Sequence, residues 1–343
     1  MFWRMSKPKA VTATINDQVI TVEPKETLLQ AALRQGVDFP YSCRVGGCAT
    51  CKCRLLDGKV KELTRSDYIL SDTELDQGYI IACQSVPRSD IRVAVAQGDG
   101  LALRSVSGRV VARESLTHDI LELRIQLEDS LRYKPGQFAQ LSLQSLPGLS
   151  RSYSFATSVR PDAQVSFFVR QVPGGVFSSH VHKQAAIGDR VTVAGPVGDF
   201  WLRPADAPLL LVAGGSGLAP IMALLEHALA QGVTRPVTLL FGARTRNDLY
   251  ALAAIESLAA EWPASFDFVP VLSDEPGDSS WPGARGFVTA LMRERTTPDC
   301  HAYLCGPPPM IDSAIALLLE CGVAKAHIHA DRFSTQHDLP ATA

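Results

Sequence analysis

The sequence lacks the features that would take it into a membrane or onto nucleic acid. Its longest apolar stretches, 207–214 and 315–319, are far shorter than the roughly 20 residues that a transmembrane helix needs. Residues 1–10 are basic but are not followed by an apolar segment, so they do not form a secretory signal. Lys and Arg total 33 against 35 Asp and Glu, and a net charge of -2 gives no cationic field for DNA or RNA. We therefore expect a cytoplasmic protein that does not bind nucleic acid.

The chain also has too few charged residues for a disordered protein, with 20% charged and 46% hydrophobic side chains. Its 343 residues exceed one ordinary core, so we expect two or three domains. Strand-like runs at 11–15 and 19–22, with a helical stretch at 27–35, predict a small α+β unit of β-grasp-like fold.

The rhythm of the sequence then changes twice. Short strands broken by Gly and Pro between 108 and 202 predict an antiparallel β-barrel. From residue 208 onward strands alternate with helices, which predicts an α/β domain with a parallel sheet. We place the three domains at 1–97, 104–204 and 205–343.

Four of the eight cysteines lie between residues 43 and 53. Without a secretory signal they indicate metal ligands or free thiols rather than disulfides. The spacing C-x4-C-x2-C with one distant cysteine is that of a plant-type [2Fe-2S] cluster, so the predicted ligands are Cys43, Cys48, Cys51 and Cys83. A zinc site is the alternative, although zinc spacings favour paired C-x2-C units. Cys53 is expected to be a free thiol, and Cys300 and Cys321 to be structural.

Three short motifs in the barrel region, at 135–138, 151–154 and 174–178, are each weak alone. In this order they resemble the flavin-binding barrel of the ferredoxin–NADP reductase superfamily, although an ordinary barrel remains the alternative. The resemblance implies that Arg151 pairs with the flavin pyrophosphate, that Tyr153 packs on the isoalloxazine and that Ser154 hydrogen-bonds near its reactive nitrogen. It also implies contacts to FAD from Val169 and from the turn that opens a helix, namely Gly175, Val176, Phe177 and Ser178.

A buried strand at 211–214 runs into a glycine-rich turn and a helix, where backbone amides can approach a dinucleotide phosphate. The turn residues are Gly214, Gly215, Ser216 and Gly217, and they depart from G-x-G-x-x-G. The endings 241–244 and 303–310 of later strands match the same superfamily. By resemblance Arg244 reaches the adenosine half of the nucleotide, Cys305 lies beside the reacting nicotinamide carbon, and Gly306 and Pro307 leave room for the ring. Cys305 as a small buried packing residue is the alternative.

Near the C-terminus, residues 330–333 match the final acidic and aromatic pair of that superfamily. Asp331 stands where many relatives have Glu, and Phe333 is expected against the flavin. Ten further residues follow Phe333, so the aromatic is not the chain end. The resemblance therefore assigns catalysis to Ser154, Cys305 and Asp331.

The order of the three regions, over roughly residues 10–333, resembles the reductase components of multicomponent bacterial oxygenases. NADH releases two electrons together whereas the cluster accepts one at a time, so we expect electrons to pass from NADH to FAD, to the cluster, and out near Arg44 and Val45. The expected acceptor is a Rieske or diiron oxygenase or hydroxylase, soluble or membrane-bound, for an aromatic or hydrocarbon substrate, and we expect a monomeric reductase. A stand-alone NAD(P)H–flavin oxidoreductase, a redox sensor and the reductase of a deoxysugar dehydration system are the alternatives. Arg244 and Arg246 would chemically allow NADPH, whereas the resemblance favours NADH.

Overall fold

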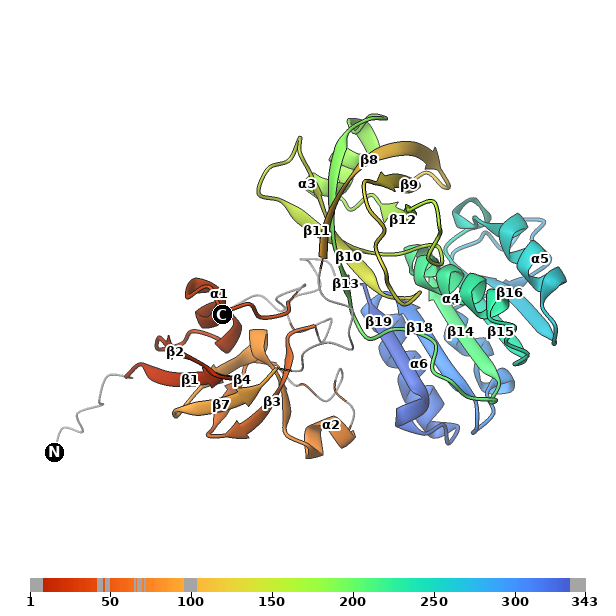
Figure 1. Cartoon of the computed structure of the whole chain (residues 1–343). Helices are drawn as coiled ribbons and strands as arrows, with labels where there is room; N and C mark the ends of the chain where they lie inside the picture. The colour runs from red at the N-terminus through yellow and green to blue at the C-terminus, as the bar shows by residue number, and fades with distance from the viewer. Residues whose placement is uncertain are drawn as a thin grey trace. The chain divides into compact units, whose positions relative to one another are not determined.

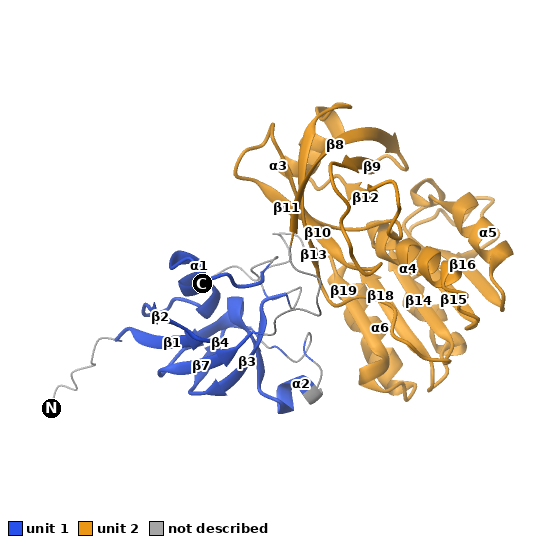
Figure 2. Cartoon of the chain, viewed as in Figure 1, with its two compact units in different colours: residues 1–100, 341–343 blue, residues 101–340 orange. Residues whose placement is uncertain are grey.

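The computed structural model describes residues 9–41, 46, 50–64, 66, 70, 72–95 and 104–333. Its internal contacts divide the chain into two compact units, residues 1–100 with 341–343 and residues 101–340 (Figure 2). The predicted fold class is confirmed in both units.

The first unit contains a mixed five-stranded sheet, and helix α1 packs on it (Figure 1). Helix α1 begins after Thr27, whose hydroxyl accepts the Gln30 amide N–H while the Gln30 side chain accepts the Thr27 N–H. This capping box explains why the predicted helix starts where it does. The sheet order is β2-β1-β7-β3-β5, with β1 and β7 parallel. The elements are β1 (Val11–Ile15), β2 (Gln18–Val22), α1 (Leu28–Arg34), β3 (Lys52–Asp57), β4 (Val60–Glu62), α2 (Asp72–Asp76), β5 (Tyr79–Ile81), β6 (Ser85–Pro87) and β7 (Ile91–Ala94).

The second unit begins with a six-stranded antiparallel sheet of order β11-β10-β13-β8-β9-β12. The sheet curls so that its two edge strands approach, and an antiparallel bridge joins Phe155 to Phe167. Alternate side chains point into the barrel core, as the period of two requires. The elements are β8 (Arg104–Ser115), β9 (Ile120–Leu127), β10 (Phe138–Leu143), β11 (Ser150–Ser154), β12 (Gln164–Arg170), α3 (Val176–Lys183) and β13 (Arg190–Val197).

The rest of the second unit is a parallel sheet of order β17-β16-β15-β14-β18-β19. Chain order reverses between β14 and β18, which makes a topological switch point at their carboxyl ends. Apolar residues from α4 and α5 cover one face of the sheet, and those from α6 cover the other. The elements are β14 (Leu209–Gly214), α4 (Leu218–Ala230), β15 (Val237–Ala243), α5 (Leu252–Glu261), β16 (Phe266–Leu272), β17 (Ala284–Arg285), β18 (His301–Gly306), α6 (Pro308–Glu320) and β19 (Ile328–Arg332).

Barrel and parallel sheet share an apolar core within the second unit. Ile120 of β9 is buried in the core of the parallel sheet, and Phe168 of β12 meets Tyr250 edge-on at 5.4 Å between ring centroids. Burying a side chain such as Ile120 contributes about 2 kcal/mol relative to exposing it. These contacts hold β9 and β12 of the barrel against the core of the parallel sheet.

Candidate functional site

Two of the four predicted cluster ligands lie in the described part of the first unit, side by side. The Cys83 backbone N–H donates to Cys51 Sγ at 3.4 Å, and the Gln84 side-chain Nε2 donates to Cys83 Sγ at 3.7 Å. Both thiols are buried. N–H groups that point at sulfur are what a thiolate-held iron–sulfur cluster requires, so this pair of cysteines fits such a cluster. Cys43 and Cys48 lie outside the described residues, as do Arg44 and Val45.

The other cysteines fit their expected structural roles. Cys53 is fully buried in β3, and burial raises the pKa of its thiol to about 12. Cys300 is buried, and Cys321 is partly buried at the end of α6. These thiols occupy packing positions.

The predicted flavin motif at 151–154 is strand β11, which pairs with β10. Ser154 is buried, and the half-buried Tyr153 ring lies 5.7 Å from that of Phe177. Arg151 is exposed and donates to the carbonyl of Ser150, and no carboxylate of the described residues lies within ion-pair distance of it. A guanidinium left without an acidic partner fits the expected pyrophosphate.

The turn before α3 is organised by Ser178. Its hydroxyl accepts the Val172 N–H at 3.1 Å and lies 3.4 Å from the carbonyl of Gly175. A Cβ on Gly175 would meet the same hydroxyl at 2.8 Å, which explains the glycine. No side chain among the described residues caps the helix N-terminus, so its first N–H groups remain available to an anion.

The remaining predicted flavin residues divide into core and surface. Phe177 and Val169 are buried in the barrel core, and the Val169 carbonyl lies 2.8 Å from His182 Nε2. Val176 is exposed. The Val169 side chain is therefore a packing residue, and only its backbone remains for a ligand.

The glycine-rich turn after β14 serves two different purposes. A Cβ on Gly217 would lie 2.2 Å from the Cys305 carbonyl oxygen, and one on Gly214 would lie 2.7 Å from Met310 Sδ. These glycines let the turn pack against the end of β18. Gly215 instead has φ +54°, and its Cβ would meet only Arg170 at 3.6 Å. Its backbone is thus the part of the turn that leaves room for a phosphate.

The three residues expected to be catalytic meet at the boundary between barrel and parallel sheet. Ser154 Oγ of the barrel donates to Asp331 Oδ2 of β19 at 3.4 Å. Asp331 pairs in register with Cys305 of β18, and the Phe333 N–H donates to the Gly306 carbonyl. Burial, with the Asp331 carboxylate as a second cause, raises the pKa of the Cys305 thiol well above its usual value. The thiol therefore stays neutral beside a carboxylate.

Sequence reasoning missed two further contacts of this region. The Tyr250 hydroxyl is buried and donates to the Gly215 carbonyl at 2.9 Å, which fixes the turn. Asp119 of the barrel binds Arg170 Nε at 3.0 Å and lies 3.5 Å from Arg244 Nη2 of the parallel sheet. No local sequence signal could identify these partners, because they come from separate elements.

The cluster of His118, Asp119 and Asp248 has the spacing of a metal site. Arg170 and Arg244 already pair with its carboxylates, so guanidinium groups meet the charge that a cation would otherwise satisfy.

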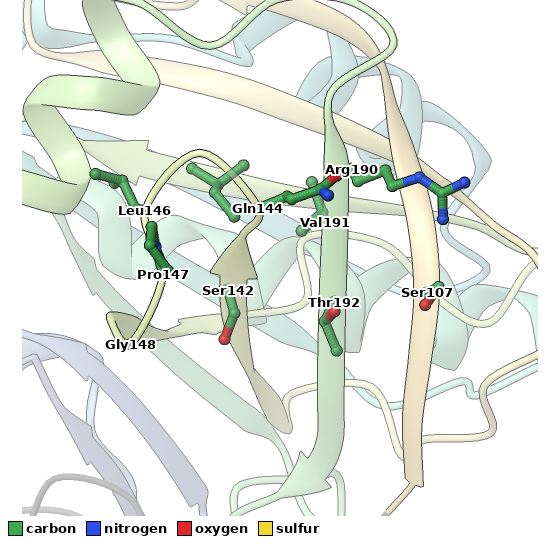
Figure 3. A pocket seen from close by; sticks show the side chains of 10 residues that line it. Ser107, Ser142, Gln144, Leu146, Pro147, Gly148, Arg190, Val191 and Thr192 are labelled. Carbon is green, nitrogen blue, oxygen red and sulfur yellow. The ribbon is translucent and has the colours of Figure 1, made fainter.

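A shallow cavity of about 340 Å³ lies on the outside of the barrel (Figure 3). Three hydroxyls line it in register across neighbouring strands, from Ser107, Ser142 and Thr192. None of the predicted site residues lines this cavity, so the candidate site lies elsewhere. Within the part of the chain that the structure describes, no helix has the length and apolar character to cross a membrane.

Comparison with known proteins gives a match for each region. The 2Fe-2S iron-sulfur cluster binding domain matches residues 13–88, the oxidoreductase FAD-binding domain residues 107–201, and the oxidoreductase NAD-binding domain residues 211–315. The predicted cofactors, [2Fe-2S], FAD and NAD, are therefore confirmed.

Relatives extend over almost the whole chain. The xylene/toluene monooxygenase electron transfer component XylA of Pseudomonas putida is 40% identical over 90% of this chain and 89% of its own length. The phenol 2-monooxygenase reductase component DmpP of Pseudomonas sp. strain CF600 is 37% identical over 96% of this chain and 95% of its own. The crystal structure of the Amycolatopsis cytochrome P450 reductase GcoB is 33% identical, covers 95% of this chain and 99% of that chain, and gives a TM-score of 0.73. The chain belongs to the family of reductase components of bacterial multicomponent oxygenases, oxidoreductases that pass electrons from NADH through FAD to a [2Fe-2S] cluster.

Proposed function

We propose that NADH is oxidised where Ser154, Asp331 and Cys305 meet, and that the first unit then delivers single electrons to an oxygenase partner. The observation that carries the first part is the 3.4 Å contact between Ser154 Oγ and Asp331 Oδ2, which joins residues 177 positions apart from two domains. Flavin supplies the conversion of a two-electron hydride donor into one-electron steps. The protein residues must hold, orient and shield the reacting groups.

The three catalytic candidates have distinct roles in this proposal. The Ser154 hydroxyl donates its hydrogen bond to Asp331, which holds that hydroxyl in one orientation beside the flavin site. Cys305 would lie beside the reacting nicotinamide carbon and would take no part in proton transfer, because burial raises the pKa of its thiol and keeps it neutral. Tyr153 and Phe333 would supply the aromatic surfaces that exclude water from the flavin ring.

The phosphates of the two nucleotides are assigned to separate anchors. Arg151 and the N-terminal turn of α3, residues 175–178, would hold the flavin pyrophosphate. Residues 214–217 before α4 would hold the nicotinamide nucleotide, with Arg244 toward its adenosine and the backbone at Gly306 and Pro307 beside its nicotinamide. The supporting features are the guanidinium of Arg151, which has no carboxylate partner among the described residues, and the positive φ of Gly215.

The proposed exit is the cluster held by Cys43, Cys48, Cys51 and Cys83. The hydrogen bond from the Cys83 backbone N–H to Cys51 Sγ, which brings these two residues together, supports this ligand set. The partner is an oxygenase or hydroxylase component, since the similar proteins serve monooxygenases of xylene, phenol and propane and a naphthalene dioxygenase. A membrane-bound partner fits the proposal, and the reductase itself acts as a monomer without nucleic acid. Cysteine ligands need a reducing compartment, so the cytoplasm remains our expectation.

The domain boundaries stay as proposed at 1–97, 104–204 and 205–343. Each of the three matched regions falls inside one of these segments.

The test compares two buried cysteines of the first unit. Cys83→Ala removes a proposed ligand, whereas Cys53→Ala removes a buried thiol of strand β3. We expect Cys83→Ala to keep NADH oxidation with ferricyanide, which takes electrons from flavin, and to lose reduction of cytochrome c and of the oxygenase. Cys53→Ala keeps both activities. Full cytochrome c reduction by Cys83→Ala would contradict the cluster as the exit.

A further inference from the structure

The end of β15 carries two arginines that could receive the 2'-phosphate of NADPH, yet both are already held by carboxylates. Arg244 Nη2 lies 3.5 Å from Asp119 Oδ2 and 3.8 Å from Asp248 Oδ1. The backbone N–H of Arg246 donates to Glu275 Oε2 at 2.9 Å, and its Nε lies 3.9 Å from Glu275 Oε1. Neither guanidinium is therefore free to receive a phosphate without giving up a carboxylate.

Glu275 reaches this position from the neighbouring strand. Parallel pairing continues past the ends of β15 and β16, because the Ser273 N–H donates to Ala243 and the Asp274 N–H donates to Arg244. This pairing places the next residue, Glu275, against Arg246. The Arg285 guanidinium holds the same loop by donating to the carbonyls of Glu275 and Pro276.

The Glu275 carboxylate is both enclosed and charged. Its side chain is only 3% exposed. The Arg246 backbone N–H, followed by the Ser279 hydroxyl and the charges of Arg246 and Arg285, lowers the pKa of Glu275. At neutral pH this corner of the site therefore contains a fixed negative charge.

In doubly wound sheets the end of the second strand contacts the ribose, where an acid binds the 2'-hydroxyl and an arginine accommodates a 2'-phosphate. No acid directly follows the last residue of β15 in this chain. We propose that Glu275 supplies that acid from the loop that follows the adjacent strand β16, and that it selects NADH over NADPH. Asp119 and Asp248 support the selection by holding Arg244. This inference rests on the proposed nucleotide site at the ends of β14 and β15.

The test removes the charge while preserving the shape. Glu275→Gln keeps an oxygen for the Arg246 N–H, and Glu275→Ala removes the charge in a second way if glutamine disturbs the loop. Asp278→Asn is the matched control, since it makes the same charge change at an exposed position of the same loop. The kcat/KM for NADPH and for NADH is measured with ferricyanide. Calorimetry then gives the Kd of adenosine 2',5'-bisphosphate and of 5'-AMP, which tests the adenosine end without any electron transfer.

We expect wild type to prefer NADH and both Glu275 variants to raise the NADPH to NADH ratio of kcat/KM at least tenfold. The Kd of the 2',5'-bisphosphate falls by a similar factor, whereas Asp278→Asn changes neither. A ratio within twofold of wild type in folded Glu275 variants, an equal change in Asp278→Asn, or a wild-type preference for NADPH would overturn the inference. Absence of any nucleotide oxidation by flavin-loaded wild type would instead contradict the proposed function.

Discussion

Gly217→Ala tests whether the close approach between the turn after β14 and the end of β18 controls hydride transfer. The new Cβ would lie 2.2 Å from the Cys305 carbonyl oxygen and 2.6 Å from its carbonyl carbon, both backbone atoms. Such pairs do not approach closer than 3.0 Å, so the turn and the strand must separate by about 0.8 Å. Displacement of a reacting group by about 1 Å costs roughly 100-fold in rate. Overpacking of this kind also lowers the free energy of unfolding by about 1–3 kcal/mol.

The assay is NADH oxidation with ferricyanide, together with the flavin and cluster absorption of the purified variant. We expect kcat/KM to fall about 100-fold while both chromophores remain. Gly277→Ala is the matched control, because a Cβ there meets nothing within 4 Å. A folded Gly217→Ala protein whose kcat/KM stays within threefold of wild type would refute the packing argument.

Three further predictions concern single side chains. Arg151→Ala should weaken FAD binding about tenfold to 100-fold, because a charge-assisted contact is lost. Flavin retention on dialysis measures this, with Arg132→Ala at an exposed position as the control. Equal retention in the two variants would show that Arg151 does not bind the flavin. Ser154→Ala should lower kcat with ferricyanide by about 100-fold and leave the KM for NADH nearly unchanged; an unchanged kcat would show that the hydroxyl is not needed. Burial lowers the pKa of His329 to about 4, so the folded state resists its protonation and stability falls as pH drops below about 6.5. Between pH 7 and pH 5, wild type should therefore lose about 2 kcal/mol more free energy of unfolding than His329→Phe, a variant that keeps an aromatic ring stacked on Tyr303. Urea titrations at both pH values measure the two losses. Equal losses would show that His329 is not the source of the pH dependence.

Local patterns in the sequence predict much of the fold because local chemistry determines those elements. The capping box at Thr27 fixes the start of α1, and the apolar run before Gly214 becomes the fully buried β14. Strand β19 could not be predicted, because Ile328–Arg332 is short, half-buried and mostly polar. It is a strand only because β18 offers an edge on which it can pair.

The site shows the same division between local and long-range information. Motif spacing identifies the predicted cluster cysteines and the glycine-rich turn after β14, because in each motif the backbone geometry of a short segment determines which residues are needed. The contact of Ser154 with Asp331 and that of Arg246 with Glu275 depend on how separate elements meet. The sequence therefore left the coenzyme preference open. Arg244 and Arg246 can be identified from it, but the contact of Arg246 with Glu275, in the loop after β16, cannot.

Anaerobic reduction by NADH, followed by electron paramagnetic resonance, tests the electron path most directly. Wild type should develop the signal of one reduced [2Fe-2S] cluster per chain as NADH is added, in step with reduction of its oxygenase partner. Cys83→Ala should bleach its flavin with NADH but show neither that signal nor partner reduction. Normal turnover of the oxygenase by Cys83→Ala would contradict the account and make flavin the direct donor.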